Sequence, residues 1–398
     1  MRKNFSVAIV GAGLAGCFSL LKLLENQYQD VALFDLGRPF AKRRRQLEGA
    51  LGCLPCSDGK FYLTDIDQFD FIDGRNFRKT KNWVLKQLES VGVTKTITDT
   101  LPSSSIQKKL TEAGWDFKTN DYVQWKPEQI HNFSRYVYRT IEPHNPNLFF
   151  DTEIRSVSKN GTGFILKTPD DEFTCEKLIV AAGRTGWRWV QDIFKDLGLP
   201  YDDSVAKIGV RFEVPTNIVK EFNRSNLSMT KPGIEVLPWN WNGTIMPEDH
   251  ADMVISCFRS NESRWNSEKL SFSYINHIPT ESGVDLSERI AKLSYLLFND
   301  RVSKERNKIY LTGRSQLNSI PEYSWLGNAI DEMSRIIPDF IEKGAYHIPN
   351  ILCHPPRVDL SQTLQTVDPN LILAGESANL GGLLGSCLSG TLAAEGLL

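Results

Sequence analysis

The feature that most constrains this chain is a glycine motif near its N-terminus. An apolar run at 5–10 leads into Gly-Ala-Gly-Leu-Ala-Gly at 11–16, which opens a segment of helical spacing at 14–25. A second apolar run, 31–35, ends in Asp35. Short apolar runs of this kind are typical of buried strands. The opening of the chain therefore predicts a strand–helix–strand unit, and a glycine motif at its first turn predicts a dinucleotide site.

Each glycine of the motif has a physical role. Gly11 allows a tight turn, Gly13 lets a pyrophosphate approach the backbone, and Gly16 lets the helix pack closely on the strand. The helix N-terminus offers N–H groups and a partial positive charge to phosphates. Asp35 ends the second strand, where an acid binds the ribose hydroxyls of adenosine. The predicted cofactor contacts of this unit are Gly11, Ala12, Gly13, Leu14, Ala15, Gly16, Asp35 and Leu36.

Two later segments repeat the pattern of a strand followed by glycine. The apolar run 172–181 leads into Ala182-Gly183. The run 371–374 leads into Gly375-Glu376, a glycine-rich turn and a helical segment from 385 onward. The sequence has no second GxGxxG motif, so we expect no separate domain for a nicotinamide cofactor.

These three segments resemble the FAD-dependent oxidoreductases of the glutathione-reductase-like superfamily, which have a Rossmann-type FAD-binding domain. In that superfamily the last segment normally reads Ala-x-Gly-Asp, and its acid contacts the ribityl or pyrophosphate part of FAD. Here Glu376 replaces the aspartate. In the superfamily, the helix that follows points its N-terminus at the flavin N1–C2=O edge. The chain is most similar to the family of FAD-utilising dehydrogenases, on the opening motif, Ser57–Lys60, Ile208–Arg211, Cys257-Phe258 and Gly381–Leu383.

The resemblance implies FAD as the cofactor and extends the set of its contacts. In the family, the loop after the acid passes along FAD from the adenine to the isoalloxazine ring. The backbone N–H groups of Gly52 and Ser57 are expected donors to phosphate or ribityl oxygens. A basic run at 42–45 can meet the pyrophosphate or adenine, or can be a solvated loop. The further predicted contacts are Arg43, Arg44, Gly52, Ser57, Ile154, Ala182, Gly183, Gly375, Glu376, Gly382 and Leu383.

The fold expected is α/β, with a Rossmann-type FAD-binding domain built from discontinuous segments and an inserted α+β substrate domain. We expect the FAD-binding domain at 1–65, 145–187 and 350–398, a helical insertion at 66–144 and a substrate or cap domain at 188–349. Polar and apolar residues alternate at 205–214, 251–258 and 270–276, which indicates a mixed or antiparallel sheet. Further helices are expected at 76–91, 103–114, 126–141, 285–299 and 325–343, and further strands at 148–154 and 163–168.

A Cys-x-x-Cys pair, Cys53 and Cys56, lies in the loop before Ser57. Structural zinc needs four ligands, and no second pair or HxxxH motif is present, so no metal is expected. The spacing suits a dithiol that exchanges electrons with a flavin. Cysteine also often fills tight buried space. The seven cysteines are scattered, which is typical of a reducing, cytoplasmic setting.

The candidate catalytic residues are charged or nucleophilic groups near the predicted turns: Lys60, Arg184, His354, Arg357, Cys53 and Cys56. His354 is a candidate base, although a lone histidine is more often structural. Arg184, Arg211 and Arg259 can clamp a carboxylate or phosphate. A surface ion pair is the commoner role for any one arginine.

The function expected is oxidation of a small molecule by hydride transfer to flavin N5, with an amine or amino acid favoured as substrate. Electrons would pass to oxygen or to an acceptor partner. Three alternatives stay open: a flavoenzyme that modifies a nucleic-acid base or its side chain, a flavin-linked dithiol/disulfide oxidoreductase using the cysteine pair, and a non-enzymatic FAD-binding redox sensor. The net charge of −2 argues against a nucleic-acid or membrane partner.

Overall fold

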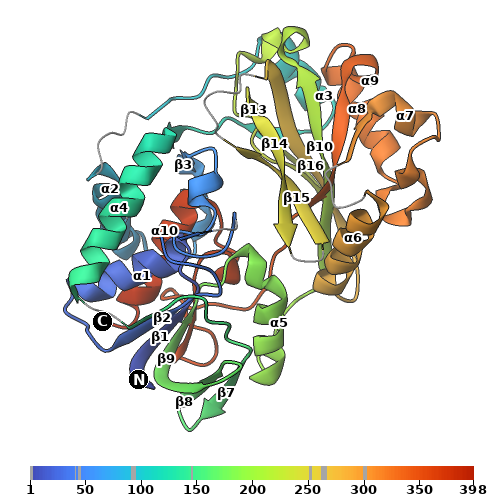
Figure 1. Ribbon diagram of the computed structural model, residues 1–398. Coiled ribbons are helices and arrows are strands. Elements are labelled where there is room, and N and C mark those ends of the chain that lie inside the picture. The colour runs from blue at the N-terminus through green and yellow to red at the C-terminus, as the bar shows by residue number, and fades with distance from the viewer. Residues whose placement is uncertain are drawn as a thin grey trace. The chain divides into compact units, whose positions relative to one another are not determined.

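The computed structural model describes residues 3–40, 42–43, 46–90, 96–144, 147–250, 253–260, 267–298 and 303–398. The chain divides into two compact units (Figure 1). Unit 1 comprises Met1–Lys95, Val123–Asp203 and His354–Leu398, and unit 2 comprises Thr96–Tyr122 and Ser204–Cys353. One unit has a largely parallel sheet and the other an antiparallel sheet, so the predicted α/β class is confirmed.

The sheet of unit 1 has the strand order β6-β2-β1-β9-β8-β7, and β19 also pairs with β9. Its strands are β1 (Asn4–Val10), β2 (Val31–Phe34), β6 (Asn147–Phe149), β7 (Ser156–Asn160), β8 (Gly163–Lys167), β9 (Glu172–Val180) and β19 (Leu371–Leu373). β6, β2, β1, β9 and β19 are parallel, and the β7–β8 hairpin pairs antiparallel with the start of β9. The apolar runs of β1, β2 and β19 are buried, as expected where a parallel sheet is covered on both faces.

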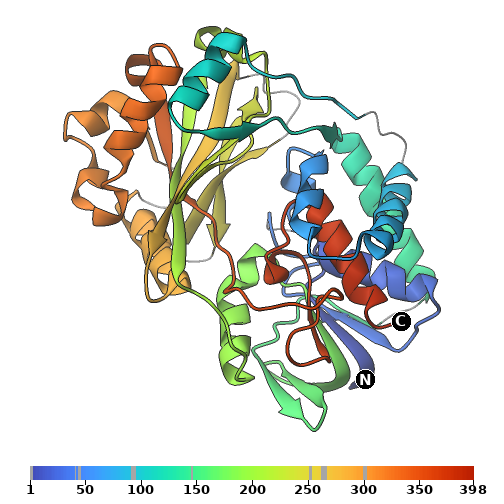
Figure 2. The same ribbon diagram turned by 180° about the vertical axis from the view of Figure 1, so that it is seen from behind.

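The helices of unit 1 are α1 (Leu14–Glu25), α2 (Gly74–Glu89), α4 (Pro127–Ile141), α5 (Trp187–Asp196) and α10 (Leu383–Glu395). α1 and α10 come from opposite ends of the chain and lie side by side (Figure 2). A Cβ on Gly390 would overlap the carbonyl oxygen of Ala15, so glycine is what permits this close approach. The Ser19 hydroxyl also donates to the Gly390 carbonyl oxygen at 2.7 Å.

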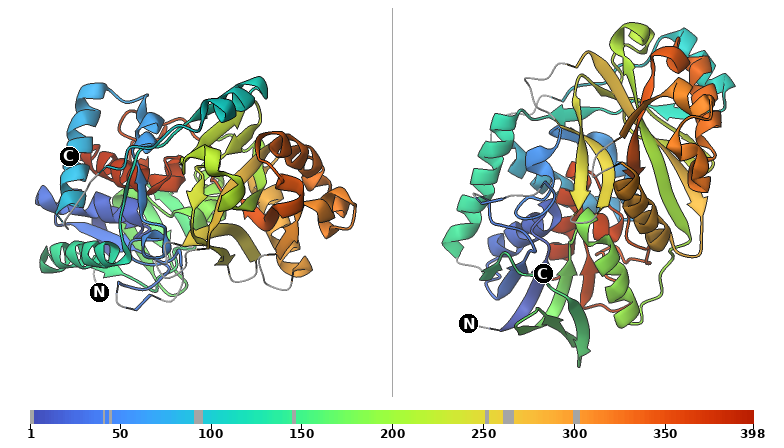
Figure 3. Two further views of the ribbon diagram at one scale, coloured as in Figure 1. Left: turned by 90° about the horizontal axis from the view of Figure 1, so that it is seen from above. Right: turned by 45° about the vertical axis from the view of Figure 1, so that its right-hand side comes forward.

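Unit 2 is built on a sheet with the order β17-β18-β10-β16-β12-β11-β4, to which β13 adds beside β16. Its strands are β4 (Asp116–Lys118), β10 (Val205–Pro215), β11 (Ser228–Lys231), β12 (Ile234–Val236), β13 (Asn240–Trp241), β16 (Lys269–Pro279), β17 (Ser303–Arg306) and β18 (Ala345–Ile351), with a separate ribbon of β14 (Thr244–His250) and β15 (Met253–Ser260). Its helices are α3 (Ser104–Glu112), α6 (Gly283–Leu297), α7 (Asn307–Leu311), α8 (Leu326–Ile336) and α9 (Phe340–Lys343). α7, α8 and α9 lie together against one face of the sheet (Figure 3).

The units follow other boundaries than those predicted. The expected helical insertion at 66–144 is not a unit of its own. Its helices α2 and α4 belong to unit 1, whereas 96–122 belongs to unit 2 because β4 pairs antiparallel with β11. The expected cap domain at 188–349 likewise loses α5 to unit 1.

One predicted helix is interrupted, and one predicted strand is shorter than expected. The helix at 325–343 is split into α8 and α9, because Ile337 precedes a proline and is held extended. The strand at 148–154 is only β6, because Asp151 has a positive φ and the chain turns there. β7, β18 and α5 were not predicted. No helix within the described ranges combines the length and apolarity needed to cross a membrane.

Candidate functional site

The parallel strands of unit 1 end at one edge of their sheet, and the predicted glycine turns meet there. The Gly11 N–H donates to the Phe34 carbonyl oxygen at 2.8 Å, which joins the ends of β1 and β2. The Ala374 N–H donates to the Val180 carbonyl oxygen at 2.9 Å, which joins the ends of β9 and β19. This carboxyl edge is where parallel α/β sheets bind ligands.

The turn from β1 into α1 is shaped around its glycines. Gly11 has a φ of +106°, and a Cβ there would overlap the Ala181 carbonyl oxygen. A Cβ on Gly16 would overlap the Gly11 carbonyl oxygen, so helix and turn are in close contact. A Cβ on Gly13, by contrast, would meet no described atom within 4 Å. Gly13 is also the N-cap of α1 and has no side chain to accept the first N–H groups. The turn therefore fits the pyrophosphate of a dinucleotide.

Asp35 has a second role beside the one predicted. Its Oδ2 accepts from the Ala12 N–H at 2.6 Å, and its Oδ1 accepts from the N–H groups of Gly37 at 2.7 Å and Gly49 at 2.8 Å. Burial raises the pKa of the Asp35 carboxyl, and these N–H groups and Arg43 oppose that rise. Asp35 thus ties the α1 turn to the following loop, and its contact with a ribose stays a prediction.

The loop at 46–52 is held by Arg43. Its guanidinium donates to the carbonyl oxygens of Gln46 at 2.9 Å and Gly52 at 2.6 Å, and also to those of Gly49 and Ala50. The side chain therefore fixes the loop that packs against the α1 turn, where Leu51 N–H donates to the Ala12 carbonyl oxygen at 2.7 Å. The predicted contact of Arg43 with the pyrophosphate or adenine stays a prediction.

The predicted N–H donors of this loop are also turned inward. The Gly52 N–H donates to the Gly49 carbonyl oxygen at 2.9 Å, and the Ser57 N–H donates to the Leu54 carbonyl oxygen at 3.2 Å. Both groups therefore stabilise the loop itself, and their predicted role as donors to phosphate or ribityl oxygens stays a prediction. Arg44 lies outside the described residues.

We expect Arg43→Gln to loosen the 46–52 loop. A hydrogen bond from a charged group contributes about 1.5–3 kcal/mol, and this substitution leaves several carbonyl groups without their donor. The free energy of unfolding should fall by about 2–4 kcal/mol, and proteolysis within 46–52 should accelerate. Arg38→Gln is the matched control, because the ion pair of Arg38 with Asp151 is exposed and should contribute under about 1 kcal/mol. Equal urea midpoints for the two variants would contradict this role.

Cys53 and Cys56 are free thiols at a short 3-10 turn, η1 (Leu54–Cys56): Cys53 is its N-cap and Cys56 is its last residue. Cys53 is exposed, and Cys56 is half-buried and lines a pocket of about 390 Å³. Arg43 and residues of α4, among them His131, line the same pocket. Burial lowers the pKa of Arg43, and the neighbouring thiols of Cys56 and Cys53 oppose that shift. Within the described ranges no group of three or more ligating side chains is placed to hold a metal ion.

Three predicted site residues from three separate segments meet, with Arg184 and His354 on Glu376. Its Oε1 lies 3.9 Å from Nε of Arg184, and its Oε2 lies 3.4 Å from Nδ1 of His354. A Cβ on Gly381 would overlap this carboxylate, so the glycine turn before α10 makes room for it. A carboxylate between a guanidinium and an imidazole can orient both groups at the carboxyl edge of the sheet.

The turns after β9 and β19 differ in how much open space lies beside their backbone. The Ala182 N–H donates to the Ser377 hydroxyl at 3.1 Å, and the Gly375 N–H donates to the Ser389 hydroxyl at 2.9 Å. Both are therefore engaged within unit 1. Gly183 has a φ of +64°, and a Cβ there would meet no described atom within 4 Å. The backbone at Gly183 thus offers open space beside the ends of β1 and β9.

The remaining predicted residues differ in their burial and in the elements that carry them. Arg357 is exposed, and its backbone forms a bridge with Asp202. Lys60 is buried on β3 (Lys60–Tyr62), which packs against α10. Leu36 is exposed, whereas Ile154 and Leu383 are buried.

Asp65 is a site residue that the sequence analysis missed. It lies in the 3-10 segment η2 (Leu63–Phe69), and its Oδ2 accepts from the Gly385 N–H at 3.4 Å, in the first turn of α10. A Cβ on Gly382, the N-cap of α10, would overlap this carboxylate. One signal for it was available in the sequence. The helix that begins at 383 is preceded by two glycines, which have no side chain to cap it. Its first N–H groups therefore need an acceptor from another part of the chain.

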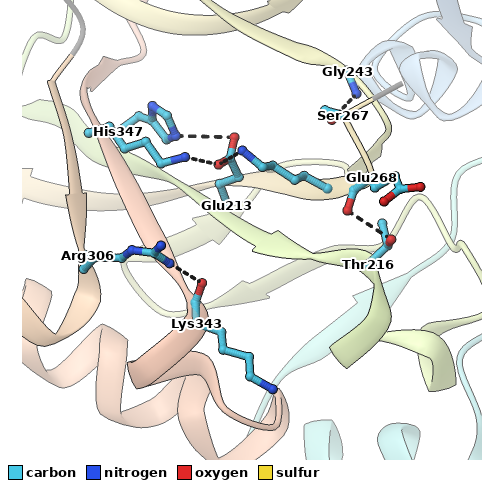
Figure 4. Close-up of polar contacts among 10 residues, drawn as sticks. Glu213, Thr216, Gly243, Ser267, Glu268, Arg306, Lys343 and His347 are labelled. Atoms are coloured by element: carbon cyan, nitrogen blue, oxygen red, sulfur yellow. Dashed lines mark hydrogen bonds and ion pairs between the residues drawn. The ribbon is translucent and has the colours of Figure 1, made fainter. Parts of the chain in front are cut away.

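Unit 2 carries its own charged cluster, around Glu213 on β10 (Figure 4). The Glu213 carboxylate accepts from Lys269 at 2.9 Å and from Lys304, and it lies 3.5 Å from Nε2 of His347. Burial raises the pKa of Glu213, but these neighbours outweigh it and the net shift is downward.

Arg211 is buried on the same strand. Its role as a clamp for a carboxylate or phosphate stays a prediction. The Arg259 side chain lies outside the described residues.

No protein-family model matches the chain, and no curated protein matches it. Among solved structures, a glycine oxidase from Geobacillus kaustophilus is similar at 13% identity and a TM-score of 0.48, covering 99% of this chain and 94% of that one. NikD, described as an unusual amino acid oxidase essential for nikkomycin biosynthesis, is similar at 10% identity and a TM-score of 0.44, covering 100% and 94%. A geranylgeranyl bacteriochlorophyll reductase-like protein from Thermoplasma acidophilum has 11% identity and a TM-score of 0.42, covering 99% and 78%. Likeness at this level does not identify a cofactor or a substrate, so both are inferred from this chain's own residues.

Proposed function

We propose that the protein is an FAD-dependent oxidoreductase that acts on a small molecule. The observation that carries the proposal is the meeting of four features at one sheet edge. They are the open backbone at Gly13, the open backbone at Gly183, the N-terminus of α10, and the cluster of Arg184 and His354 around Glu376. A single extended dinucleotide can lie along such an edge, with charged side chains beside one end of it.

The residues of unit 1 fit distinct tasks in this proposal. FAD, when bound, supplies a two-electron acceptor for hydride. The first N–H groups of α1 and the open side of Gly13 would bind its pyrophosphate. The Glu376 carboxylate faces Nδ1 of His354, which favours the tautomer with its proton on that nitrogen. Nε2 of His354 is then the atom that can accept a proton from a substrate.

An amine or amino acid is the substrate class that we propose. The sequence has a single GxGxxG motif, so the electrons are expected to come from an organic substrate in the flavin pocket rather than from a second bound nucleotide. Arg184 follows the Gly183 turn and is partly exposed, so its guanidinium is suited to orienting a substrate carboxylate. Oxygen or an acceptor partner would take the electrons.

The substrate class is tested by mixing the FAD-loaded protein anaerobically with panels of primary amines, N-alkyl amines, amino acids and 2-hydroxy acids. Bleaching of the flavin band by amines or amino acids alone is the expected result. Bleaching only by 2-hydroxy acids would contradict the C–N substrate, and the absence of bleaching by any panel would contradict a substrate oxidase.

A flavin-linked dithiol enzyme is the second candidate, because Cys53 and Cys56 are three residues apart and neighbour the Arg43 guanidinium. The two candidates differ in the number of electrons taken up during an anaerobic dithionite titration. Uptake of two electrons per FAD supports the small-molecule oxidoreductase. Uptake of four, reduced to two in Cys53→Ser or Cys56→Ser, would support the dithiol enzyme instead.

We expect His354→Gln to lower the rate of flavin reduction by substrate about 100-fold, which is typical for the loss of a general base. The affinity for FAD should change less than about threefold, because the substitution leaves the α1 turn intact. His144→Gln is the matched control, since His144 is exposed in the same unit. Stopped-flow reduction at equal rates in both variants would exclude His354 as the base.

A further inference from the structure

The N-terminus of α10 is already bound by a carboxylate of this chain. Asp65 Oδ2 accepts from the Gly385 N–H at 3.4 Å and lies where a Cβ on Gly382 would be. Its own segment is held against the same turn by Gln68, whose side-chain amide donates to the Gly381 carbonyl oxygen at 3.3 Å. A carboxylate at this position is favoured by the partial positive charge of the helix end.

The surroundings of Asp65 disfavour its charge. The pKa of Asp65 is raised to about 7: burial is the largest cause, Glu376 and Asp67 add to the rise, and the N–H groups of Gly385 and Leu384 oppose it. The Cys387 thiol on α10 interacts with Asp65, and its own pKa is raised by burial. Lys60 lies on the adjacent strand β3, and Arg184 and His354 contact Glu376. Asp65 therefore lies near two other carboxylates, those of Glu376 and Asp67, and accepts a hydrogen bond from the N-terminus of α10.

This helix end lies on the edge that the proposed dinucleotide would follow. The strand order places β2, with Asp35, on one side of β1, and places β9 and β19 on the other. The pyrophosphate would lie at α1, so the end of the cofactor beyond it would extend toward β9, β19 and the start of α10. An electron-rich edge of a ligand and an ionised Asp65 would compete for the same N–H groups.

We propose that Asp65 is a cofactor-positioning residue that couples FAD binding to the uptake of one proton. The inference rests on the proposed function. In the ligand-free chain an ionised Asp65 occupies the start of α10. When FAD binds, the N–H groups of α10 are taken by the cofactor, and Asp65 stays beside them as the neutral acid. The only covalent change is addition of one proton from solvent to the carboxylate.

Proton linkage fixes the sign of the pH dependence. Below about pH 7 Asp65 is already neutral, so FAD binding needs no proton and its Kd is constant. Above about pH 7 each bound FAD must bring in a proton, so Kd rises by up to tenfold per pH unit. Between pH 6.0 and pH 8.5 the expected weakening is about 30-fold.

The test measures Kd by fluorescence titration at pH 6.0, 7.0, 7.75 and 8.5 for FAD and for ADP-ribose. ADP-ribose carries the adenosine and the pyrophosphate without a flavin, and its pyrophosphate does not titrate in this window. For the wild-type chain, Kd for FAD should rise about 30-fold and Kd for ADP-ribose should stay within about threefold. Calorimetry of FAD binding at pH 8 in two buffers of different ionisation enthalpy should show the uptake of one proton.

Asp65→Asn keeps the size of the side chain and an oxygen that can accept from Gly385, but it cannot ionise. Its Kd for FAD should vary less than about threefold across the same pH range. Asp67→Asn is the matched control, because Asp67 is exposed in the same segment, and it should keep most of the wild-type slope.

Two results would overturn the inference while leaving the proposed function in place. One is a wild-type Kd for FAD that does not change with pH, and the other is an unchanged slope in Asp65→Asn. Failure of the wild-type chain to bind either ligand would overturn the proposed function and this inference together. The wild-type comparison of FAD with ADP-ribose decides the matter even where a variant does not fold.

Discussion

Replacing Gly13 by valine is expected to abolish tight FAD binding while leaving the fold intact. A Cβ added at Gly13 meets no described atom within 4 Å, and the φ of −63° at this position is accessible to any residue. The new side chain instead fills the space through which a pyrophosphate would reach the N–H groups of α1. The affinity for FAD should fall about 100-fold or more, which corresponds to about 2.8 kcal/mol. Fluorescence titration with FAD measures it.

Gly74→Val is the matched control for this substitution. Gly74 begins α2, and a Cβ there also meets no described atom within 4 Å. Both variants should therefore unfold within a few degrees of the wild-type chain, and only Gly13→Val should lose FAD. Normal FAD affinity in Gly13→Val would remove the α1 turn from the binding site.

Replacing Gly390 by valine is expected to unfold the protein or to leave it strongly destabilised. In an ordinary helix interior, replacing glycine by a larger residue is tolerated, since glycine itself costs about 0.5–1 kcal/mol relative to alanine. Here the added Cβ would overlap the backbone carbonyl of Ala15, so α1 and α10 would have to separate. The loss should be about 3 kcal/mol or more. Thermal unfolding measures it, with Gly74→Val again as the control.

A wild-type melting temperature in Gly390→Val would contradict the observed crossing of α1 and α10. The same variant tests how far the site depends on that crossing. Both helices begin at the carboxyl edge of the sheet, at Gly13 and Gly382, so a variant that survives with separated helices should also bind FAD more weakly.

The sequence predicted the opening of unit 1 in detail. The helix expected at 14–25 is α1 with the same bounds, because an unbroken apolar face and a glycine start leave little choice. The run that ends in Asp35 is β2, and the run at 371–374 is β19. These elements are set by local patterns, namely short apolar runs followed by turn residues, and such patterns can be read without knowledge of tertiary contacts.

The roles of the charged residues could not be predicted in the same way. The hydrogen bonds of Arg43 were not predicted, because four backbone carbonyls gather around it only once its loop is folded. Asp65 had no local signal of its own, because its partner is the start of a helix 320 positions later. That residues 96–122 belong to unit 2 was not predicted for a similar reason, since β4 pairs with β11, which lies far along the chain. Hydrogen-bond partners of this kind are decided by topology, which a spacing pattern does not contain.

We expect unit 1 to hold FAD at the carboxyl edge of its sheet. The most direct measurement is to strip the purified protein of small molecules, incubate it separately with FAD and with NAD, and record the stoichiometry and visible spectrum after gel filtration. We expect one FAD to be retained per chain, with a Kd of about 1 µM or less and a perturbed flavin band, and no NAD to be retained. Failure to retain FAD, or retention of NAD in its place, would contradict this expectation.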